Sequence, residues 1–436
     1  MRMPVAILAL ALYGGMVPAQ DAPPPIASLD SAWASIGRSY YDTALVKGAW
    51  RSTYDSLRLA LGDTARDAAV RAAIRRLIAV PRQSHFALIP GDAVPRPDAP
   101  TSGGPPGTTG IEIRMIGDTA VVWRVAPGSP GARAGIRAGS TLTHVDTVPV
   151  DSLRDRLGRA FPDNPRKSAL LLASLANARL SGPTGDTARL TVRDRRGRAR
   201  SYAVVRTALA GQSTRFGNLP PLVVRSHADS VRVVSARRAI LVPRITISAW
   251  FPVIAPTLDR QLFALREAPA LIIDLRGNPG GVVGMLAGVA GHFSDSAVNL
   301  GVMYGRGATL NLRANPRLVN PSGERVNVFT GPIAILIDPF SASTSEFFAA
   351  GMQALGRARI FGETSAGEAL PAAMVRLPNG DVLMHPIADH VDAGGRRVEG
   401  RGVVPDEVTP LTRRDLLDGR DAALDAARAW LARTIP

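Results

Sequence analysis

The sequence predicts a multidomain α+β protein with an N-terminal helical bundle, a β-rich domain and a C-terminal α/β core. Its 436 residues suffice for about three domains of ~150 residues each. Apolar residues recur at helical spacing up to residue 80 and alternate as in strands after residue 110. From about Arg237, near-continuous apolar strands alternate with helices. We therefore expect domains over residues 20–100, 107–208 and 209–436.

The first 19 residues have the pattern of a cleaved secretory signal. "MRMPVAILALALYGGMVPA" has a basic residue near its start, continues with a short apolar stretch and ends at a small-residue site before Gln20. The apolar stretch is shorter than the ~18 residues that a membrane span needs. We expect an exported protein, periplasmic or secreted and not integral to a membrane after cleavage; an uncleaved anchor is the alternative.

Composition restricts the classes of partner and chemistry. The formal charge is +16, but the basic residues are scattered or stand in short groups such as "RDRRGRAR", without interleaved aromatic residues. We therefore expect a solvated basic surface and no nucleic-acid partner. The chain has no cysteine, which excludes disulfides, a thiol nucleophile and cysteine-based zinc sites.

The N-terminal domain is expected to be a small helical bundle. "SLDSAWASIGRSYYDTAL", "GAWRSTYDSLRLAL" and "RDAAVRAAIRRLIAV" carry apolar residues at helical spacing. The period changes to that of a strand in "PRQSHFALIPGD", and a Pro/Gly/Thr-rich linker follows from Val94 to Gly110.

The β-rich domain contains "PGSPGARAGIRAGSTL" between strand-like segments, and a helical stretch "SALLLASLANARLSG" before the strand pair "ARLTVRDRRGRARSYAVV". The first of these motifs resembles that of a PDZ domain, with Ser140 in place of the usual Asp. The resemblance implies that an extended peptide, often a free C-terminus, adds to a sheet edge, with a backbone nest near Gly110 and Ile111. A structural domain without a ligand is the alternative.

In the core, the strand-like runs "RAILVPRITI", "PALIIDLRG", "PIAILID" and "ARIFGET" alternate with helix-compatible runs, and the chain closes with the expected helix "RRDLLDGRDAALDAARAWLART". This alternation favours a mostly parallel sheet covered by helices. Two loops stand out. "SASTSEFFAAG" places small hydroxyl residues where a buried strand turns into a helix, which suits either a nucleophile or an ordinary N-cap. "ALIIDLRGNPGG" can present backbone N–H groups to an oxyanion or form a tight turn.

"LIIDLRGNPGG", "ILIDPFSASTSEFFAAGMQALGRARIFGET" and "VEGRGVVPD" resemble, in order and spacing, the core of the serine peptidase family of carboxyl-terminal processing proteases and tricorn protease. The resemblance implies a core of the ClpP/crotonase-like type. It also implies that Ser343 is the nucleophile and that the backbone N–H groups of Thr344 and Gly280 form the oxyanion hole.

The expected base of the processing proteases is missing. In those enzymes it is a lysine, but the aligned run "GETSAGEAL" has Glu368 in that place, and Ala372, just after the run, stands where its glutamine partner would be. A carboxylate cannot act as a desolvated neutral lysine does. No lysine follows Lys167, so a Ser-Lys dyad within the core is excluded.

The tricorn branch implies another base. It uses a Ser-His pair before the PDZ domain and a glutamate near the G-V-x-P-D motif, which correspond to Ser84, His85 and Glu399. Histidine has an ordinary pKa near ~6.5 and can accept the serine proton in its neutral form, while the other two groups orient its ring. His385 and His390 are alternative bases; their spacing does not match a zinc motif, and we expect no metal.

Together these features predict an exported serine peptidase that cleaves polypeptides internally or near their C-termini, through an acyl-enzyme and without a cofactor. The alternative is a non-catalytic protein on the same fold that binds peptides or apolar ligands, and a serine esterase is a third possibility.

Overall fold

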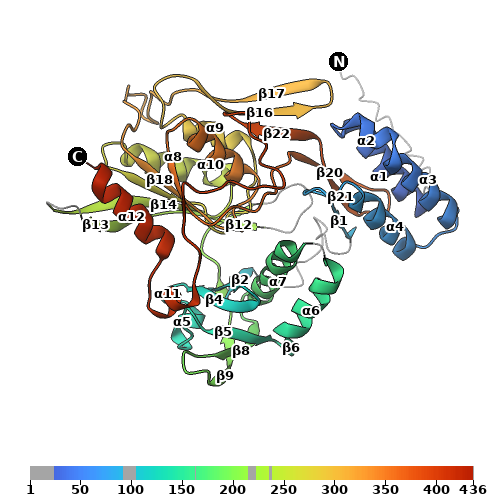
Figure 1. The fold of residues 1–436 in the computed structure, drawn as a ribbon, viewed down its shortest axis with the longest axis horizontal. Helices are drawn as coiled ribbons and strands as arrows, with labels where there is room; N and C mark the ends of the chain where they lie inside the picture. Colours follow the sequence, from blue (N-terminus) through green and yellow to red (C-terminus); the bar gives the residue numbers. More distant parts are fainter. Residues whose placement is uncertain (1–23, 92–104, 163, 215–221, 235–237, 436) are drawn as a thin grey trace, which may run out of the picture.

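A computed structural model gives the architecture of three parts, a helical N-terminal part, a β-rich domain and a large α/β core (Figure 1). The expected signal segment, residues 1–19, lies outside the described residues. No helix within the described part combines the length and the hydrophobicity that crossing a membrane requires. The structure describes residues 24–91, 105–162, 164–214, 222–234 and 238–435.

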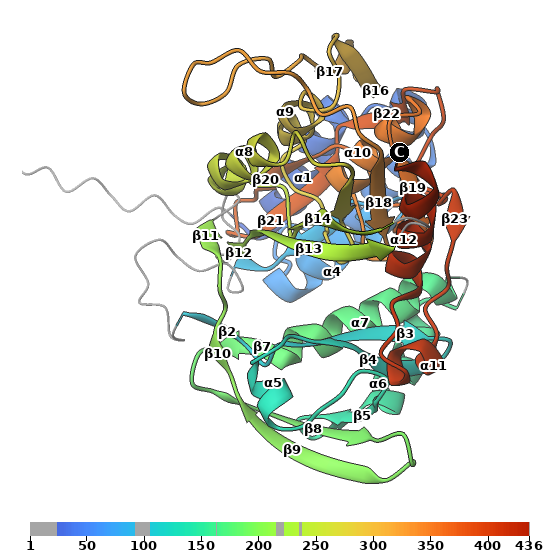
Figure 2. The same cartoon turned by 90° about the vertical axis from the view of Figure 1, so that its left-hand side faces the viewer.

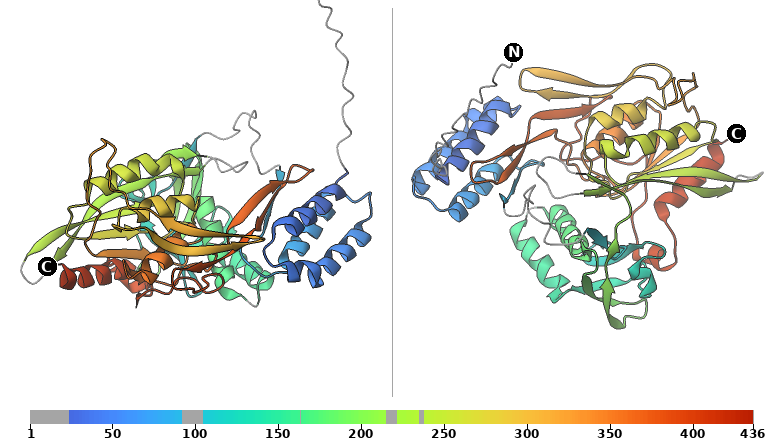
Figure 3. Two further views of the ribbon diagram at one scale, coloured as in Figure 1. Left: turned by 90° about the horizontal axis from the view of Figure 1, so that it is seen from above. Right: turned by 180° about the vertical axis from the view of Figure 1, so that it is seen from behind.

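The N-terminal helices form the expected bundle and stand on one side of the core (Figure 3). Aromatic side chains fill the space between them. Trp50 is fully buried, its indole N–H donates to the Leu77 carbonyl at 2.8 Å, and its ring meets that of Tyr40 edge-on at 5.0 Å. The helices are α1 (Ile26–Ser39), α2 (Thr43–Lys47), α3 (Ala49–Leu61) and α4 (Asp67–Ala79).

A short strand after α4 fastens this bundle to the core. Strand β1 (Ala87–Ile89) pairs antiparallel with β21 (Val382–Pro386), which also pairs with β20 (Ala372–Arg376). The buried carboxylate of Asp381 accepts two hydrogen bonds from Arg71 on α4, at 2.8 and 2.9 Å. The residues between α4 and β1 are therefore held against the core from both sides.

The β-rich domain is a five-stranded antiparallel sheet in the order β3-β4-β5-β8-β9, with β3 at one end and the short β6 beside β5. The predicted strand pair and the predicted helix are confirmed as β8, β9 and α7. A smaller sheet has the order β10-β2-β7. The elements are β2 (Pro106–Thr108), β3 (Ile111–Ile116), β4 (Thr119–Val125), α5 (Pro130–Arg133), β5 (Thr141–Val145), β6 (Val148–Pro149), α6 (Val150–Ala160), α7 (Pro165–Leu180), β7 (Ser181–Pro183), β8 (Thr187–Arg193), β9 (Ala199–Val205) and β10 (Thr207–Ala208).

The core is built on a six-stranded sheet, β13-β14-β15-β18-β19-β23, in which all neighbours after β14 are parallel. Apolar side chains cover both faces, as the continuous apolar runs predict. A second sheet, β17-β16-β22, is antiparallel. The elements, after the hairpin β11 (Gln212–Thr214) and β12 (Leu222–Val224), are β13 (Ser226–Val234), β14 (Ala239–Ile247), α8 (Ala255–Ala264), β15 (Leu271–Asp274), α9 (Gly284–Ala290), β16 (Val298–Gly305), β17 (Ala308–Ala314), β18 (Ile333–Ile337), α10 (Thr344–Ala354), β19 (Arg359–Gly362), β22 (Ala388–Asp392) and β23 (Glu407–Val408).

The single C-terminal helix expected from the sequence is wrong, because two helices occur there. Helix α11 (Arg413–Leu417) stops before Gly419, whose φ of +69° breaks the right-handed helix, and α12 (Ala422–Thr434) starts afresh. Asp421 caps α12 by accepting the Leu424 N–H at 3.2 Å. Helix α12 then covers one face of the large sheet, and α11 reaches the β-rich domain (Figure 2).

A buried ion pair joins the β-rich domain to the core. Arg114 on β3 donates to Asp338 at 2.9 Å, and both side chains are more than 90% buried. The guanidinium also lies 4.2 Å from the ring centres of Trp123 and Phe340. Asp338 begins the loop that leads from β18 to α10, so the domain contact reaches the segment with the serine cluster.

Candidate active site

Ser343 lies at the turn from β18 into α10, as the strand-to-helix motif predicts. Its backbone has φ of +55°, a region that residues other than glycine seldom adopt. The residue is half-buried, whereas its neighbours Ala342 and Thr344 are buried. A strained turn thus presents one hydroxyl-bearing residue at the start of a helix, where the positive end of the helix dipole favours developing negative charge.

The backbone of Ser343 is held from two directions. Its N–H donates to the Glu368 carbonyl at 2.9 Å and to Glu346 Oε2 at 3.0 Å. Glu346 stands on the first turn of α10 and is completely buried. Its other donors are the Ser365 hydroxyl at 2.6 Å and the backbone N–H groups of Gly367 at 2.7 Å and Glu368 at 3.0 Å.

Glu346 therefore connects the Ser343 loop to the segment 365–368. Burial raises the pKa of its carboxyl to about 7, against the effect of the hydrogen bonds that it accepts. The motifs of the sequence did not single out this residue as functional. The signal was present, because a glutamate three residues after a serine at a helix start has the spacing of a capping box.

Three of the four predicted catalytic residues form one chain of hydrogen bonds. The Ser84 hydroxyl lies 2.7 Å from His85 Nδ1 and donates to Glu399 Oε2 at 2.9 Å. The Ser84 N–H donates to Glu399 Oε1 at 2.9 Å, and the Ala369 N–H donates to Oε2 at 2.8 Å. The glutamate is buried, so its position is defined by these donors.

These hydrogen bonds set the tautomer of His85. Because the Ser84 hydroxyl gives its proton to a carboxylate oxygen, it accepts the Nδ1–H of the imidazole. The lone pair then lies on Nε2, where a base needs it. Burial lowers the pKa of His85 to about 4, so the ring is neutral at ordinary pH. Its φ of +60° is a second strained backbone position at the site.

A single segment connects these hydrogen bonds to Ser343. The Glu368 carbonyl accepts the Ser343 N–H, and the next residue, Ala369, donates to Glu399. Ser343 and Glu399 are therefore anchored to consecutive residues, and Glu399 in turn binds Ser84, which lies more than 250 residues before Ser343 in sequence. Glu368, at the position of the lysine of the processing proteases, contributes its backbone to this anchoring.

The glycine-rich loop packs directly against Ser343. Gly280 has φ of +97°, and a Cβ placed on it would lie 2.6 Å from the Ser343 Cβ. The Thr344 hydroxyl donates to the Gly281 carbonyl at 3.0 Å. The N–H of Gly280, one of the two expected oxyanion donors, donates to Asn278 Oδ1 at 2.9 Å in this structure. It would have to leave Asn278 to serve an oxyanion.

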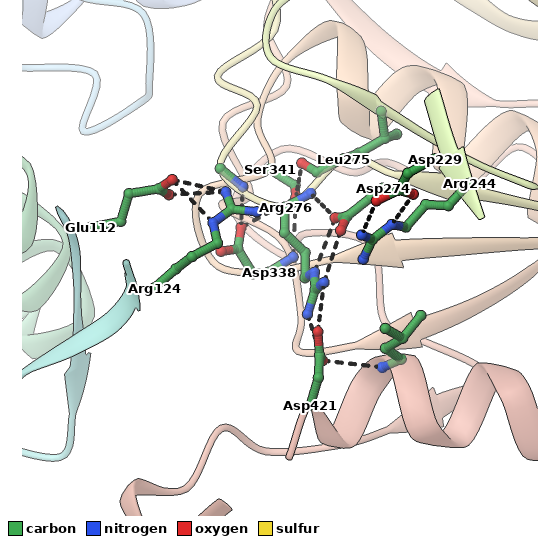
Figure 4. A network of polar contacts seen from close by, with 12 residues as sticks. Glu112, Arg124, Asp229, Arg244, Asp274, Leu275, Arg276, Asp338, Ser341 and Asp421 are labelled. Carbon is green, nitrogen blue, oxygen red and sulfur yellow. Dashed lines mark hydrogen bonds and ion pairs between the residues drawn. The ribbon is translucent and has the colours of Figure 1, made fainter. Parts of the chain in front are cut away.

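Ion pairs behind the two loops fix their relative position (Figure 4). Arg276 donates to Asp274 and to Asp421, which caps α12, with distances from 2.7 to 3.0 Å. Burial opposes ionisation of Asp274, but the Arg276 guanidinium holds the pKa of that carboxyl below its usual value. The Ser341 hydroxyl donates to the Leu275 carbonyl at 2.8 Å, which links the loop after β18 to the loop after β15.

The alternative histidines are enclosed in the core. His385 is buried, with Nδ1 3.1 Å from the Pro386 carbonyl. His390 is buried beneath α10, with its ring centre 3.9 Å from that of Phe347. Burial lowers the pKa of both histidines. No group of three metal-ligating side chains comes together in the described ranges.

A cleft of about 400 Å³ adjoins the site. Three parts of the chain line it: the segment before β1, the first half of α7 and the loops around the nucleophile. Its charged lining residues are Arg82, Arg166, Lys167, Glu368 and Glu399. The cleft therefore runs between the β-rich domain and the core, next to the hydrogen-bonded relay.

The backbone N–H groups expected to bind a peptide carboxylate in the β-rich domain already donate to neighbouring hydroxyl groups. The Gly110 N–H donates to the Thr108 hydroxyl at 2.9 Å, and the Ile111 N–H donates to the Thr109 hydroxyl at 3.4 Å. A peptide carboxylate would have to compete with these hydroxyl groups.

Comparison with known proteins gives two matches to protein-family models. Residues 245–409 match Peptidase family S41, and residues 121–157 match the PDZ domain. The first range contains the Ser343 loop, the glycine-rich loop and Glu399. The second contains the glycine-rich turn of the β-rich domain.

The chain is similar to several curated proteins. It is 27% identical over 336 residues to tricorn protease homolog 2 of Streptomyces coelicolor, covering 74% of this chain and 25% of that protein. It is 24% identical to the carboxy-terminal-processing protease of Bartonella bacilliformis, covering 73% of this chain and 64% of that one. The chain thus spans a quarter of the first relative and just under two thirds of the second.

Solved structures share the fold. The photosystem II D1 C-terminal processing protease matches with a TM-score of 0.59 at 19% identity, over 94% of this chain and 97% of that one. Mature CPAF matches with a TM-score of 0.61 at 16% identity, over 94% and 99%. The arrangement of helices, PDZ domain and core is therefore that of these multidomain α+β proteins. Residues 245–409 therefore belong to peptidase family S41, a family of serine hydrolases, and the chain also carries a PDZ domain.

Proposed function

We propose that this protein is a serine peptidase that cleaves polypeptides through an acyl-enzyme, with Ser343 as nucleophile and His85 as base. The observation that carries the proposal is the relay from His85 through Ser84 to Glu399. It leaves the Nε2 lone pair of a neutral imidazole available and anchors the relay one residue away from the carbonyl that holds the Ser343 N–H.

The reaction follows from these groups. The Ser343 hydroxyl attacks the scissile carbonyl carbon while Nε2 of His85 takes its proton. The resulting imidazolium is stabilised through the Ser84 hydroxyl and the Glu399 carboxylate. The tetrahedral intermediate collapses, the C–N bond breaks, and the imidazolium protonates the leaving amine. Water then attacks the acyl-enzyme with His85 again as base, which releases the carboxylate product and the serine.

Backbone N–H groups would stabilise the oxyanion in both steps. Thr344 is the first residue of α10, and Gly280 touches the nucleophile. The Gly280 N–H donates to Asn278 in the free protein and would change its acceptor to the oxyanion. The developing negative charge makes the oxyanion the stronger acceptor. Such exchange on substrate binding agrees with the general tightening of catalytic hydrogen bonds in the transition state.

Polypeptides are the proposed substrates, cleaved internally or near the C-terminus, since relatives bear the name carboxy-terminal-processing protease and the cleft runs between the PDZ domain and the core. The parallel sheet with helices on both faces supports a core of the ClpP/crotonase-like type. The leader at residues 1–19 supports export, to the periplasm or outside the cell.

The test is covalent labelling with a fluorophosphonate, mapped by peptide mass spectrometry, on the wild type and on His85→Ala. The matched control is His144→Ala, an exposed histidine of the PDZ domain. We expect Ser343 to be labelled in the wild type and the control, and at least ~100-fold more slowly in His85→Ala. Absence of labelling in the folded wild type would favour a non-catalytic binding protein. Equal labelling of all three would place the base elsewhere.

A further inference from the structure

The edge of the PDZ sheet is the place where an extended peptide could add as a further strand. Among the described residues, β4 is the one strand that pairs with β3. An edge strand leaves alternate backbone N–H and C=O groups without partners, and strand addition uses these groups. In this protein, helix α7 lies along that edge.

Asn177 of α7 occupies the hydrogen-bonding positions of β3. Its Oδ1 accepts the Ile113 N–H at 2.7 Å, and its Nδ2 donates to the Ile113 carbonyl at 3.1 Å. A side-chain amide has the donor and the acceptor of a peptide group. Asn177 therefore makes both hydrogen bonds that one residue of an added strand would make. The Ile113 carbonyl also accepts from the Arg114 guanidinium at 3.1 Å, and Ile113 is completely buried.

The rest of the helix fixes this arrangement. Leu172, Ala176 and Leu180 are buried in the same hydrophobic cluster as Ile113. The C-terminal end of α7 leads directly into β7. The match to the PDZ family model ends at residue 157, so α7 lies beyond the matched part of the domain.

The other end of α7 reaches the catalytic cleft. Arg166 in its first turn donates to the Thr364 carbonyl at 3.0 Å and to the Ser365 carbonyl. The Ser365 hydroxyl in turn donates to Glu346, which holds the Ser343 N–H. One helix thus contacts both the β3 edge and the segment that positions the nucleophile.

We propose that α7 is a built-in occupant of the peptide-binding edge of the PDZ domain. An extended polypeptide pairs with Ile113 only after Asn177 has released it. Release of α7 would also disturb the Arg166 contacts at the cleft, so that peptide capture and cleft geometry are linked, and linkage between two sites is reciprocal. The binding part of this proposal does not depend on the proposed peptidase activity.

The size of the effect follows from the two hydrogen bonds. Each net hydrogen bond contributes about 1 kcal/mol, so removal of the amide should favour the peptide about five- to thirtyfold. Asn177→Ala removes both bonds. Asn177→Asp keeps an acceptor for the Ile113 N–H and loses the donor, so it should give a smaller gain. Leu175→Ala is the matched control, since Leu175 is 42% exposed on the same helix.

The experiment measures binding of a fluorescein-labelled decapeptide of alternating Val and Thr with a free C-terminal carboxylate. All proteins are full-length and carry Ser343→Ala, so that cleavage cannot consume the probe. Fluorescence anisotropy gives Kd, and hydrogen exchange of residues 111–116 reports the edge of β3. Circular dichroism establishes that each variant is folded.

We expect the parent and Leu175→Ala to bind weakly and alike, and Asn177→Ala to bind about five- to thirtyfold tighter. In Asn177→Ala without peptide, residues 111–116 should exchange faster, and the peptide should restore their protection. If Asn177→Ala fails to fold, Asn177→Asp is compared with Leu175→Ala instead, and it should still bind more tightly, with the smaller gain. The proposal is overturned if the Asn177 variants bind no tighter than Leu175→Ala, or if the parent binds the probe with β3 protected and α7 undisturbed.

Discussion

The enzyme should keep its activity to a much lower pH than it would with a histidine base of ordinary pKa. Burial lowers the pKa of His85 to about 4, and its Nδ1 is occupied by Ser84. The folded protein therefore keeps the imidazole neutral where a solvated histidine is mostly protonated. The perturbation is a pH change, and the quantity that responds is the rate of the first covalent step.

The magnitude follows from the two pKa values. At pH 5 a histidine with an ordinary pKa of ~6.5 is neutral in about 3% of molecules. A histidine with a pKa of about 4 is neutral in roughly 90%. The labelling rate at pH 5, relative to pH 7.5, is then expected near 0.9 rather than near 0.03, a difference of about thirtyfold.

The assay is the second-order rate of fluorophosphonate labelling of Ser343 between pH 4 and pH 8, with His85→Ala as the background. Stability has to be followed in parallel. The folded pKa lies below the unfolded one, so the unfolded state binds the extra proton and stability falls as pH decreases from ~6.5 to about 4. Circular dichroism at each pH separates loss of fold from protonation of the base.

A midpoint at or above pH 6.5 in protein that is still folded would refute the reasoning. It would mean that solvent reaches the imidazole or that a nearby carboxylate stabilises its charged form. A labelling rate that is equally slow in the wild type and in His85→Ala at every pH would remove His85 from the reaction.

Three further perturbations test the geometry. Gly280→Ala places a Cβ 2.6 Å from that of the nucleophile at a φ of +97°, so we expect kcat/KM to fall at least ~100-fold, whereas Gly284→Ala, with no atom within 4 Å of its added Cβ, should retain peptidase activity. Ser84→Ala breaks the relay and should lower kcat about 100-fold or more without a matching change in KM, while Ser84→Thr, which keeps a hydroxyl, should recover part of it; equal rates in both would contradict the relay. Arg114→Met leaves the buried Asp338 without its partner and should lower the free energy of unfolding by about 3 kcal/mol in urea titrations, and the double variant with Asp338→Leu should be less destabilised than the single one.

Much of the fold could be predicted from short segments of the sequence. The apolar period distinguished the helices of the first domain from the strands of the second, and the continuous apolar runs indicated the parallel core. The sequence predicts a single C-terminal helix because apolar residues keep their helical spacing on both sides of Gly419. The spacing alone does not show that the helix breaks there. The strand-to-helix turn at Ser343 was also a local property.

By itself, the sequence determined the types of the elements, the family resemblance and the inventory of groups able to act as base. The absence of lysine after residue 167 is enough to exclude a Ser-Lys dyad in the core. The adjacency of Ser84 and His85 likewise needs no tertiary contact. These are properties of short segments or of composition, which one chain displays directly.

Only the tertiary structure decided which of these groups meet. The hydrogen bond from Ser84 to Glu399 spans 315 positions, and the pairing of β1 with β21 holds the nearby segment against the core. No pattern in the sequence indicates that Gly280 bonds to Asn278. The same is true of the bond between Asn177 and the edge of β3. Such contacts depend on the packing of distant elements, and a buried polar group takes whichever partner that packing brings within reach.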